Sequence, residues 1–558
     1  MKRTNHFFIL LLSAFFLTTF NYQTTACTNI LVTKGASKTG STMISYAADS
    51  HVLYGELYHW PAREYPEGAK LKVYEWDTGK YLGEIDQVRH TYSVIGNMNE
   101  HQVSIGETTY GGRSELRDTN AIMDYGSLIY ITLQRAKTAR EAIEIMTSLV
   151  EKYGYYSSGE SFSIADPKEV WVMDLIGKGP ENKGAVWVAV KIPDGYISAH
   201  ANQARITTFP LNDKENCIYS KDVISFAREM GYFNGKNKDF SFADAYAPLD
   251  FGAVRFCEAR VWAAFRHANK AEMDKYVDYA KGESTNRIPL YIKPDRKLGR
   301  EDIMEMMRDH FEGTPLDMNV DAGAGPYKLP YRWRPLVWEV DGEKYFNERA
   351  IATQQTGFSF IAEMRSWLPD PIGGILWFGV DDANSTVYMP MYCGMTKVPH
   401  CLAVGNGDML TYSPTSAFWV FNTVSNRAYT RYSDMIIDIK KVQKELENKF
   451  FELTPAVDAA AKKLFKQNPA AAREYLTDYS VTQAELTVDR WRELGNFLLV
   501  KYVDGNVHPE ENGVFKRNKW GNPAYPEHPG YSKEFYKKII EDTGDKLKVK
   551  EYPPEKGK

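Results

Sequence analysis

Several features are missing from this sequence of 558 residues, and each absence excludes a class of protein. After residue 20 there is no apolar run of the roughly 20 residues that a membrane-spanning helix needs. The 68 Lys and Arg residues are outnumbered by 72 Asp and Glu, which argues against a nucleic-acid-binding protein. Neither a Cys-x-x-Cys pair nor a His-Glu-x-x-His helix is present, so no metal and no cofactor are predicted.

The N-terminus has the pattern of a secretory signal. A short basic stretch over residues 1–6 precedes an apolar run over residues 7–20, which is shorter than a membrane anchor. Small residues at Thr24 and Ala26 then precede Cys27, as a signal peptidase requires. We therefore expect an exported protein, periplasmic or extracellular, whose mature chain begins at Cys27.

An N-terminal cysteine has two interpretations. It can carry the lipid of a bacterial lipoprotein, but that signal normally has Leu where this chain has Thr24. It can also be a nucleophile whose own α-amine, with a pKa near 7.7–8.0, acts as the base. Residues 28–34 and 41–48 predict a β-hairpin directly after Cys27 in place of a flexible tether, which favours the nucleophile.

Four motifs follow one another along the chain: CTNILVTKGAS from Cys27, GNMNEH from Gly96, VSIGE from Val103 and ISAHANQAR from Ile197. In this order they resemble peptidase family C69, the cysteine dipeptidases among the N-terminal-nucleophile (Ntn) hydrolases. The likeness extends over roughly residues 27–440, and penicillin V acylases and bile salt hydrolases are related to the same family.

The pattern of elements predicts an α+β fold, and the resemblance implies the four-layer αββα sandwich of Ntn hydrolases with a mostly helical C-terminal elaboration. We expect a signal peptide at 1–26, a catalytic unit with insertions at 27–430 and a helical and irregular region at 431–558. The expected elements are helices at 124–137, 139–153, 434–453, from Thr454-Pro455 onward and at 482–502, strands at 162–166, 170–175, 185–192 and 196–201, and irregular chain from 516.

The resemblance also suggests the roles of five residues. Cys27 would supply the thiol as nucleophile and the amine as base, and Asp49 would orient Cys27. The alternative interpretation of Asp49 is a carboxylate that caps a turn. Asn99 is the first choice for binding the oxyanion, and Asn202 would complete that site. Arg205 would stabilise the thiolate or pair with a substrate carboxylate. The structural alternatives are turn or loop asparagines and a solvated arginine.

Other polar residues carry separate expectations. Many relatives have an arginine in the segment 45–48, where this chain has Tyr46, so either another cation serves or the pocket chemistry differs. Glu107 is a candidate for binding a substrate ammonium, with a solvated edge-strand glutamate as the alternative. The pair Asp381-Asp382 is expected in a solvated turn.

The remaining four cysteines have structural interpretations. Cys393 and Cys401 can form a disulfide if the protein is exported, whereas Cys217 and Cys257 are expected to be buried thiols.

These observations favour an exported cysteine dipeptidase that cleaves dipeptides or short peptides through a thioester. The alternatives are an Ntn amidase or acylase on N-acyl substrates and a non-catalytic lipoprotein that binds peptide or glycan. A dipeptide carries two opposite charges, so its pocket needs both an anion and a cation, whereas an acylase pocket is long and apolar. The expected partner is a small peptide, with no nucleic acid and no membrane span, and the oligomeric state stays open.

Overall fold

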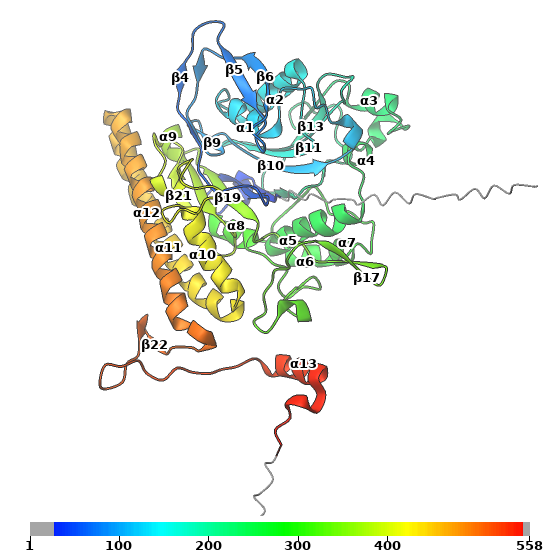
Figure 1. The fold of residues 1–558 in the computed structure, drawn as a ribbon. Helices are drawn as coiled ribbons and strands as arrows, with labels where there is room; N and C mark the ends of the chain where they lie inside the picture. Colours follow the sequence, from blue (N-terminus) through cyan, green and yellow to red (C-terminus); the bar gives the residue numbers. More distant parts are fainter. Residues whose placement is uncertain (1–26, 551–558) are drawn as a thin grey trace, which may run out of the picture.

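The computed structural model describes residues 27–550, so the predicted signal at 1–26 lies outside the described part. These residues form a mixed α and β structure built on two large antiparallel sheets (Figure 1). The first sheet has the order β16 (Tyr291–Ile292), β14 (Ile197–His200), β1 (Asn29–Val32), β2 (Thr42–Asp49), β19 (Thr356–Met364), β20 (Gly374–Val380), β21 (Met389–Tyr392). The second has the order β15 (Cys217–Tyr219), β13 (Ala185–Lys191), β12 (Val170–Gly177), β11 (Gly159–Ala165), β10 (Ser104–Gly111), β9 (Met98–Asn99), β8 (Val94–Ile95), β3 (His59–Trp60).

Short hairpins and helices surround the two sheets. The two-stranded pairs are β4 (Arg63–Glu64) with β7 (His90–Thr91), β5 (Lys70–Tyr74) with β6 (Tyr81–Asp86), β17 (Val337–Val340) with β18 (Glu343–Phe346), and β22 (Glu510–Glu511) with β23 (Val514–Phe515). The helices are α1 (Tyr125–Leu133), α2 (Ala139–Tyr153), α3 (Val223–Glu229), α4 (Phe242–Tyr246), α5 (Ala259–Ala268), α6 (Lys270–Met273), α7 (Val277–Ala280), α8 (Arg300–Met307), α9 (Asp370–Gly373), α10 (Ala417–Tyr429), α11 (Tyr432–Gln467), α12 (Pro469–Lys501) and α13 (Lys533–Thr543), and a π-helical turn, Ala253–Glu258, leads into α5.

The central strands are buried along their whole length. Every residue of β1, β2, β11 and β12 is buried, which explains their near-continuous runs of apolar and small residues. The strands β1, β2 and β11 to β14 agree with the expected ones to within a few residues. The expected hairpin after Cys27 is therefore confirmed.

The two sheets face each other across a thin core. β10 packs against β1 and β2, and a Cβ atom added to Gly106 would lie 2.7 Å from the side-chain nitrogen of Asn29 and 3.2 Å from Cβ of Tyr46. Only glycine permits this close approach. Helices α1 and α2 contact the second sheet, whereas α5 and α8 contact the first. Residues from both sheets can therefore converge at the end of β1.

The C-terminal region differs from the expectation in three places. The helix expected at 482–502 is the second part of α12, which begins at Pro469. We expected a new helix at Thr454-Pro455, but α11 runs through Pro455 without a break. A proline inside a helix loses its N–H hydrogen bond and its ring crowds the carbonyl four residues earlier, and the packing of α11 against α12 offsets this cost. The segment after residue 516 contains α13, which Figure 1 shows apart from the long helices.

Candidate active site

The strand register places Cys27 between two other segments of the first sheet. Asn29 pairs with His200, so continuing the antiparallel register of β1 and β14 brings Cys27 opposite Asn202. On the other side Thr28 bridges Ala47, which brings Cys27 next to the end of β2 and Asp49. The sheet itself thus gathers three of the five predicted site residues.

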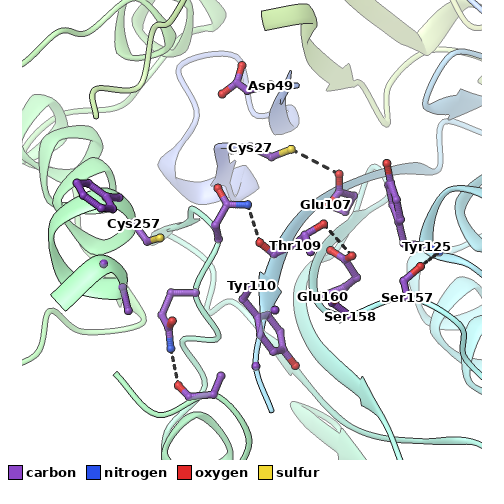
Figure 2. Close-up of a pocket in the computed structure, with 18 of the residues that line it drawn as sticks. Cys27, Asp49, Glu107, Thr109, Tyr110, Tyr125, Ser157, Ser158, Glu160 and Cys257 are labelled. Carbon is purple, nitrogen blue, oxygen red and sulfur yellow. Dashed lines mark hydrogen bonds between the residues drawn. The ribbon is translucent and has the colours of Figure 1, made fainter. Parts of the chain in front are cut away.

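Cys27 lines a cavity of about 720 Å³ between the two sheets and the segment 247–257. Figure 2 shows this pocket and the side chains around it. Residues of both charge signs line it: the acidic residues are Asp49, Glu75, Asp77, Glu107, Glu160 and Asp250, and the basic residues are Arg113 and Arg117. The pocket therefore offers charges of both signs, as a dipeptide requires.

The thiol of Cys27 is buried and lies beside acidic groups. The residue is 5% exposed, and its Sγ lies 3.6 Å from Oε1 of Glu107 and 3.9 Å from the hydroxyl of Tyr46. Burial and the negative charges of Glu107 and Asp49 raise the pKa of this thiol well above its ordinary value. The thiol needs a neighbouring base before it can act as a nucleophile at neutral pH.

The Asp49 carboxylate is fixed by partners other than Cys27. Arg349 Nη2 donates to Asp49 Oδ2 at 2.6 Å, and the Thr356 hydroxyl donates to Oδ1 at 2.6 Å. In Figure 2 this carboxylate is turned away from the sulfur of Cys27. Burial raises the pKa of Asp49, and the charge of Arg349 opposes that rise. The charge of Asp49 raises the pKa of the Cys27 thiol, whereas a hydrogen bond from the Asp49 backbone lowers it.

Asn202 is the predicted residue whose amide faces the thiol's pocket. Its φ of 56° is left-handed, a conformation that asparagine tolerates better than most residues. Nδ2 donates to the Thr109 carbonyl at 2.6 Å, and Oδ1 accepts from Arg260 Nη2 at 2.8 Å. An amide nitrogen has two N–H groups, and the second has no partner among the described residues.

Arg260 joins the amide of Asn202 to the backbone of Cys27. Its Nη1 donates to the Cys27 carbonyl at 2.6 Å and to the Thr28 hydroxyl at 2.9 Å. Arg349 binds Asp49 on the other side. No sequence motif pointed to Arg260 or Arg349, and together these two arginines supply the cations that Tyr46 cannot.

The structure brings neither Asn99 nor Arg205 to Cys27. The buried amide of Asn99 donates to the carbonyls of Leu133 and Ala136 at 2.7 Å each and accepts from the backbone N–H groups of His101 and Val103 at 3.0 Å each. All of its hydrogen-bonding capacity is used to hold a turn against the end of α1, away from the pocket lining.

Arg205 also has a structural role. It forms a buried ion pair with Glu258 at 2.8 Å and donates to the carbonyls of Ala199, Ile288, Pro289 and Leu290. Its guanidinium is therefore buried and not solvated.

Two expectations about cysteines and one about acids are wrong. Cys393 and Cys401 are both free, and Cys393 donates to the Asp370 carbonyl at 3.1 Å. Cys217 is buried as expected, but Cys257 is only partly buried and lines the pocket. The pair Asp381-Asp382 is buried at 1% exposure each, because hydroxyl and amide donors from neighbouring segments satisfy it.

Residues 27–550 contain neither a candidate membrane span nor a candidate metal site. No helix there combines the length and apolarity that a bilayer crossing needs. Within the same residues no three His, Cys, Asp or Glu side chains group as metal ligands.

Comparison with known proteins identifies the chain as a peptidase. A family model described as Peptidase family C69 matches residues 56–445, and the chain belongs to that family. Cys27 itself lies outside the matched residues. The family match therefore assigns no role to this thiol, and its role is inferred from the geometry of the pocket.

Curated relatives extend the similarity. A probable dipeptidase of Salmonella dublin is 25% identical over 390 residues, covering 66% of this chain and 81% of that protein. A probable dipeptidase of Latilactobacillus sakei is 25% identical over 390 residues, covering 66% and 74%. A probable dipeptidase B of Streptococcus pyogenes serotype M1 is 22% identical over 503 residues, covering 87% of this chain and 94% of that protein.

Proposed function

We propose that this peptidase is an exported dipeptidase of the Ntn type, with a four-layer αββα catalytic unit and Cys27 as its nucleophile. The observation that carries the proposal is the position of the Cys27 thiol in a pocket with both carboxylates and guanidinium groups. The names of the relatives agree with a dipeptide substrate. A dipeptide's ammonium and carboxylate each find an opposite charge there.

The base in this proposal is the α-amine that removal of residues 1–26 would release. The raised pKa of the thiol means that it stays protonated while its own nitrogen is an amide. A free α-amine, with a pKa near 7.7–8.0, is largely neutral at slightly alkaline pH and can take the thiol proton. Export and activation then depend on the same cleavage.

The chemical steps need no further group. The thiolate attacks the peptide carbonyl, and the free N–H of Asn202 donates to the oxyanion. The Cys27 ammonium returns its proton to the leaving amine, which leaves a thioester. The neutral amine then takes a proton from water as the water attacks the thioester, and it gives that proton back to the departing thiolate. The two products are amino acids.

The pocket disfavours both alternatives. An acylase pocket would be long and apolar, whereas this one is lined by several charged groups. A lipid-bearing cysteine belongs at the end of an exposed tether, whereas Cys27 is 5% exposed and adjoins a buried strand. An acyl chain would have to displace the packing around the pocket.

The direct test replaces Cys27 in the mature protein, residues 27–558. Cys27→Ala should abolish dipeptide hydrolysis, and Cys27→Ser should leave only weak activity, while circular dichroism stays as in the wild type. Full activity of the alanine variant would contradict the proposal. Intact-mass analysis of exported protein provides the second test, because a diacylglycerol adduct on Cys27 would support the lipoprotein instead.

A further inference from the structure

Two buried glutamates at the pocket's inner wall each have an unsatisfied oxygen. Glu107 on β10 and Glu160 on β11 are diagonal neighbours on one face of the sheet, since Glu160 pairs with Thr109. They are 1% and 0% exposed. One oxygen of each is satisfied: the Tyr46 hydroxyl donates to Glu107 at 2.5 Å and the Thr109 hydroxyl donates to Glu160 at 2.8 Å. The other oxygen of each accepts no hydrogen bond from any other described residue, and the two carboxyl groups lie within hydrogen-bonding reach of each other.

No cation of the described chain forms an ion pair with these carboxylates. Their known donors are all neutral, namely the hydroxyls of Tyr46 and Thr109 and the thiol of Cys27, and both carboxylates line the same pocket as Cys27 (Figure 2). Burial raises the pKa of both groups, and the charge of Glu107 raises that of Glu160 further. Two adjacent buried carboxylates cannot both ionise without a cation, so the empty pair retains one proton.

We propose that this carboxylate pair is the subsite for the substrate's α-ammonium group, which takes the place of the shared proton when a dipeptide binds. The inference rests on the proposed dipeptidase function and adds the orientation of the substrate. The displaced proton leaves to water, and both carboxylates then bind the ammonium as a charge-assisted pair.

The distance between this carboxylate pair and the thiol places the first peptide bond of a substrate at the thiol. Glu107 Oε1 lies 3.6 Å from Sγ of Cys27. In an amino acid the nitrogen and the carbonyl carbon are about 2.5 Å apart, and a nucleophile approaches its carbon from about 3–3.5 Å. An ammonium held by the pair therefore leaves the first carbonyl of the peptide beside the thiol. The enzyme would remove the N-terminal residue and reject N-acylated substrates.

Calorimetry on the mature Cys27→Ala protein tests the proton exchange directly. Alanyl-alanine is titrated at pH 7 in phosphate and in Tris, whose ionisation enthalpies differ, so that the difference gives the protons released. We expect about one proton released per dipeptide bound, and N-acetyl-alanyl-alanine should bind at least a hundred-fold more weakly. Equal binding of the two peptides, or binding of the free dipeptide without proton release, would overturn the inference.

A matched pair of variants separates the subsite from a general effect on folding. Glu160→Gln keeps the side-chain shape and does not contact Cys27. It should remove the proton release and lower kcat/KM for alanyl-alanine at least ten-fold, with kcat less affected than KM. Glu115→Gln changes an exposed carboxylate outside the pocket lining and should leave both unchanged. A Glu160→Gln enzyme with wild-type kcat/KM would refute the subsite.

These results are distinguishable from a failure of the proposed function. If the wild type hydrolyses free and N-acetylated dipeptides equally, the thiol peptidase stands and the ammonium subsite fails. If the Cys27→Ala protein binds alanyl-alanine with release of a proton but the wild type does not hydrolyse it, the subsite stands and the dipeptidase fails.

Discussion

Replacing each of two asparagines by alanine should separate a catalytic amide from a structural one. The sequence motifs make Asn99 the first choice for binding the oxyanion and Asn202 the second donor, but the structure gives these two residues different surroundings. Asn202 lies opposite Cys27 with one N–H that has no partner among residues 27–550, whereas Asn99 uses its whole amide on backbone groups. The two variants should therefore fail in different assays.

The expected magnitudes follow from those contacts. Loss of one oxyanion donor costs about a hundred- to a thousand-fold in kcat, so Asn202→Ala should lose activity by that factor with little change in KM. Asn99→Ala removes the partner from three buried backbone groups and from the partly buried N–H of His101. At about 1–3 kcal/mol for each unsatisfied group, the free energy of unfolding should fall by several kcal/mol while kcat of the folded protein stays near wild type.

Backbone strain at position 202 needs its own control. Alanine is strained at the φ of 56° found there, so Asn202→Gly, which tolerates that conformation, should recover stability but not activity. Urea unfolding and dipeptide hydrolysis on the mature proteins measure the two effects. If Asn202→Gly has wild-type kcat, or if Asn99→Ala loses kcat without losing stability, the assignment is refuted.

Two further predictions concern the thiol and a buried acid. Iodoacetamide should alkylate Cys27 at least ten-fold faster at pH 8 after removal of residues 1–26 than before, since only the cut chain has the amine base, and equal rates would count against that base. Asp381 is buried and its pKa is raised to about 7, so its proton stabilises the fold at low pH, and the free energy of unfolding should fall by up to about 4 kcal/mol as pH rises from about 4 to about 7. Asp381→Asn, which tolerates the same left-handed φ of 65°, should flatten that fall and be more stable than wild type at pH 8 by thermal unfolding; an unchanged pH dependence would show that another group causes it.

Local patterns predicted the elements near Cys27 well. The hairpin of β1 and β2 follows from β-branched residues on both sides of a glycine-rich turn. α2 begins at Ala139, directly after Thr138, whose side chain accepts the N–H of Glu141 as a helix cap. Such signals involve residues a few positions apart, so the sequence alone carries them. The local signals of the hairpin place Cys27 just before β1.

Contacts between distant segments were not predictable in the same way. The Arg260 bond to Cys27 spans 233 positions and the Arg349 bond to Asp49 spans 300. The motif around Asn99 has the composition of a turn, but only the position of α1 determines whether its amide faces the pocket or the protein interior. The expectation of a solvated turn at Asp381-Asp382 is wrong because α10, about 40 residues further along the chain, supplies Asn422 and Ser425 as hydrogen-bond donors to Asp381.

The surroundings of His200 leave the amine as the proposed base. A histidine is the usual partner of a nucleophilic cysteine, and His200 lies only two residues before Asn202. Its ring is fully buried between the hydroxyls of Thr108 and Ser163, at 2.8 and 2.7 Å, and it is absent from the pocket lining. Burial and the charge of Arg205 lower its pKa to about 3, so it cannot hold the thiol proton at neutral pH. The carboxylates near Cys27 oppose ionisation of its thiol. A neutral α-amine on the same residue can take the thiol proton without changing the net charge of this acidic pocket, because an ammonium forms beside the thiolate.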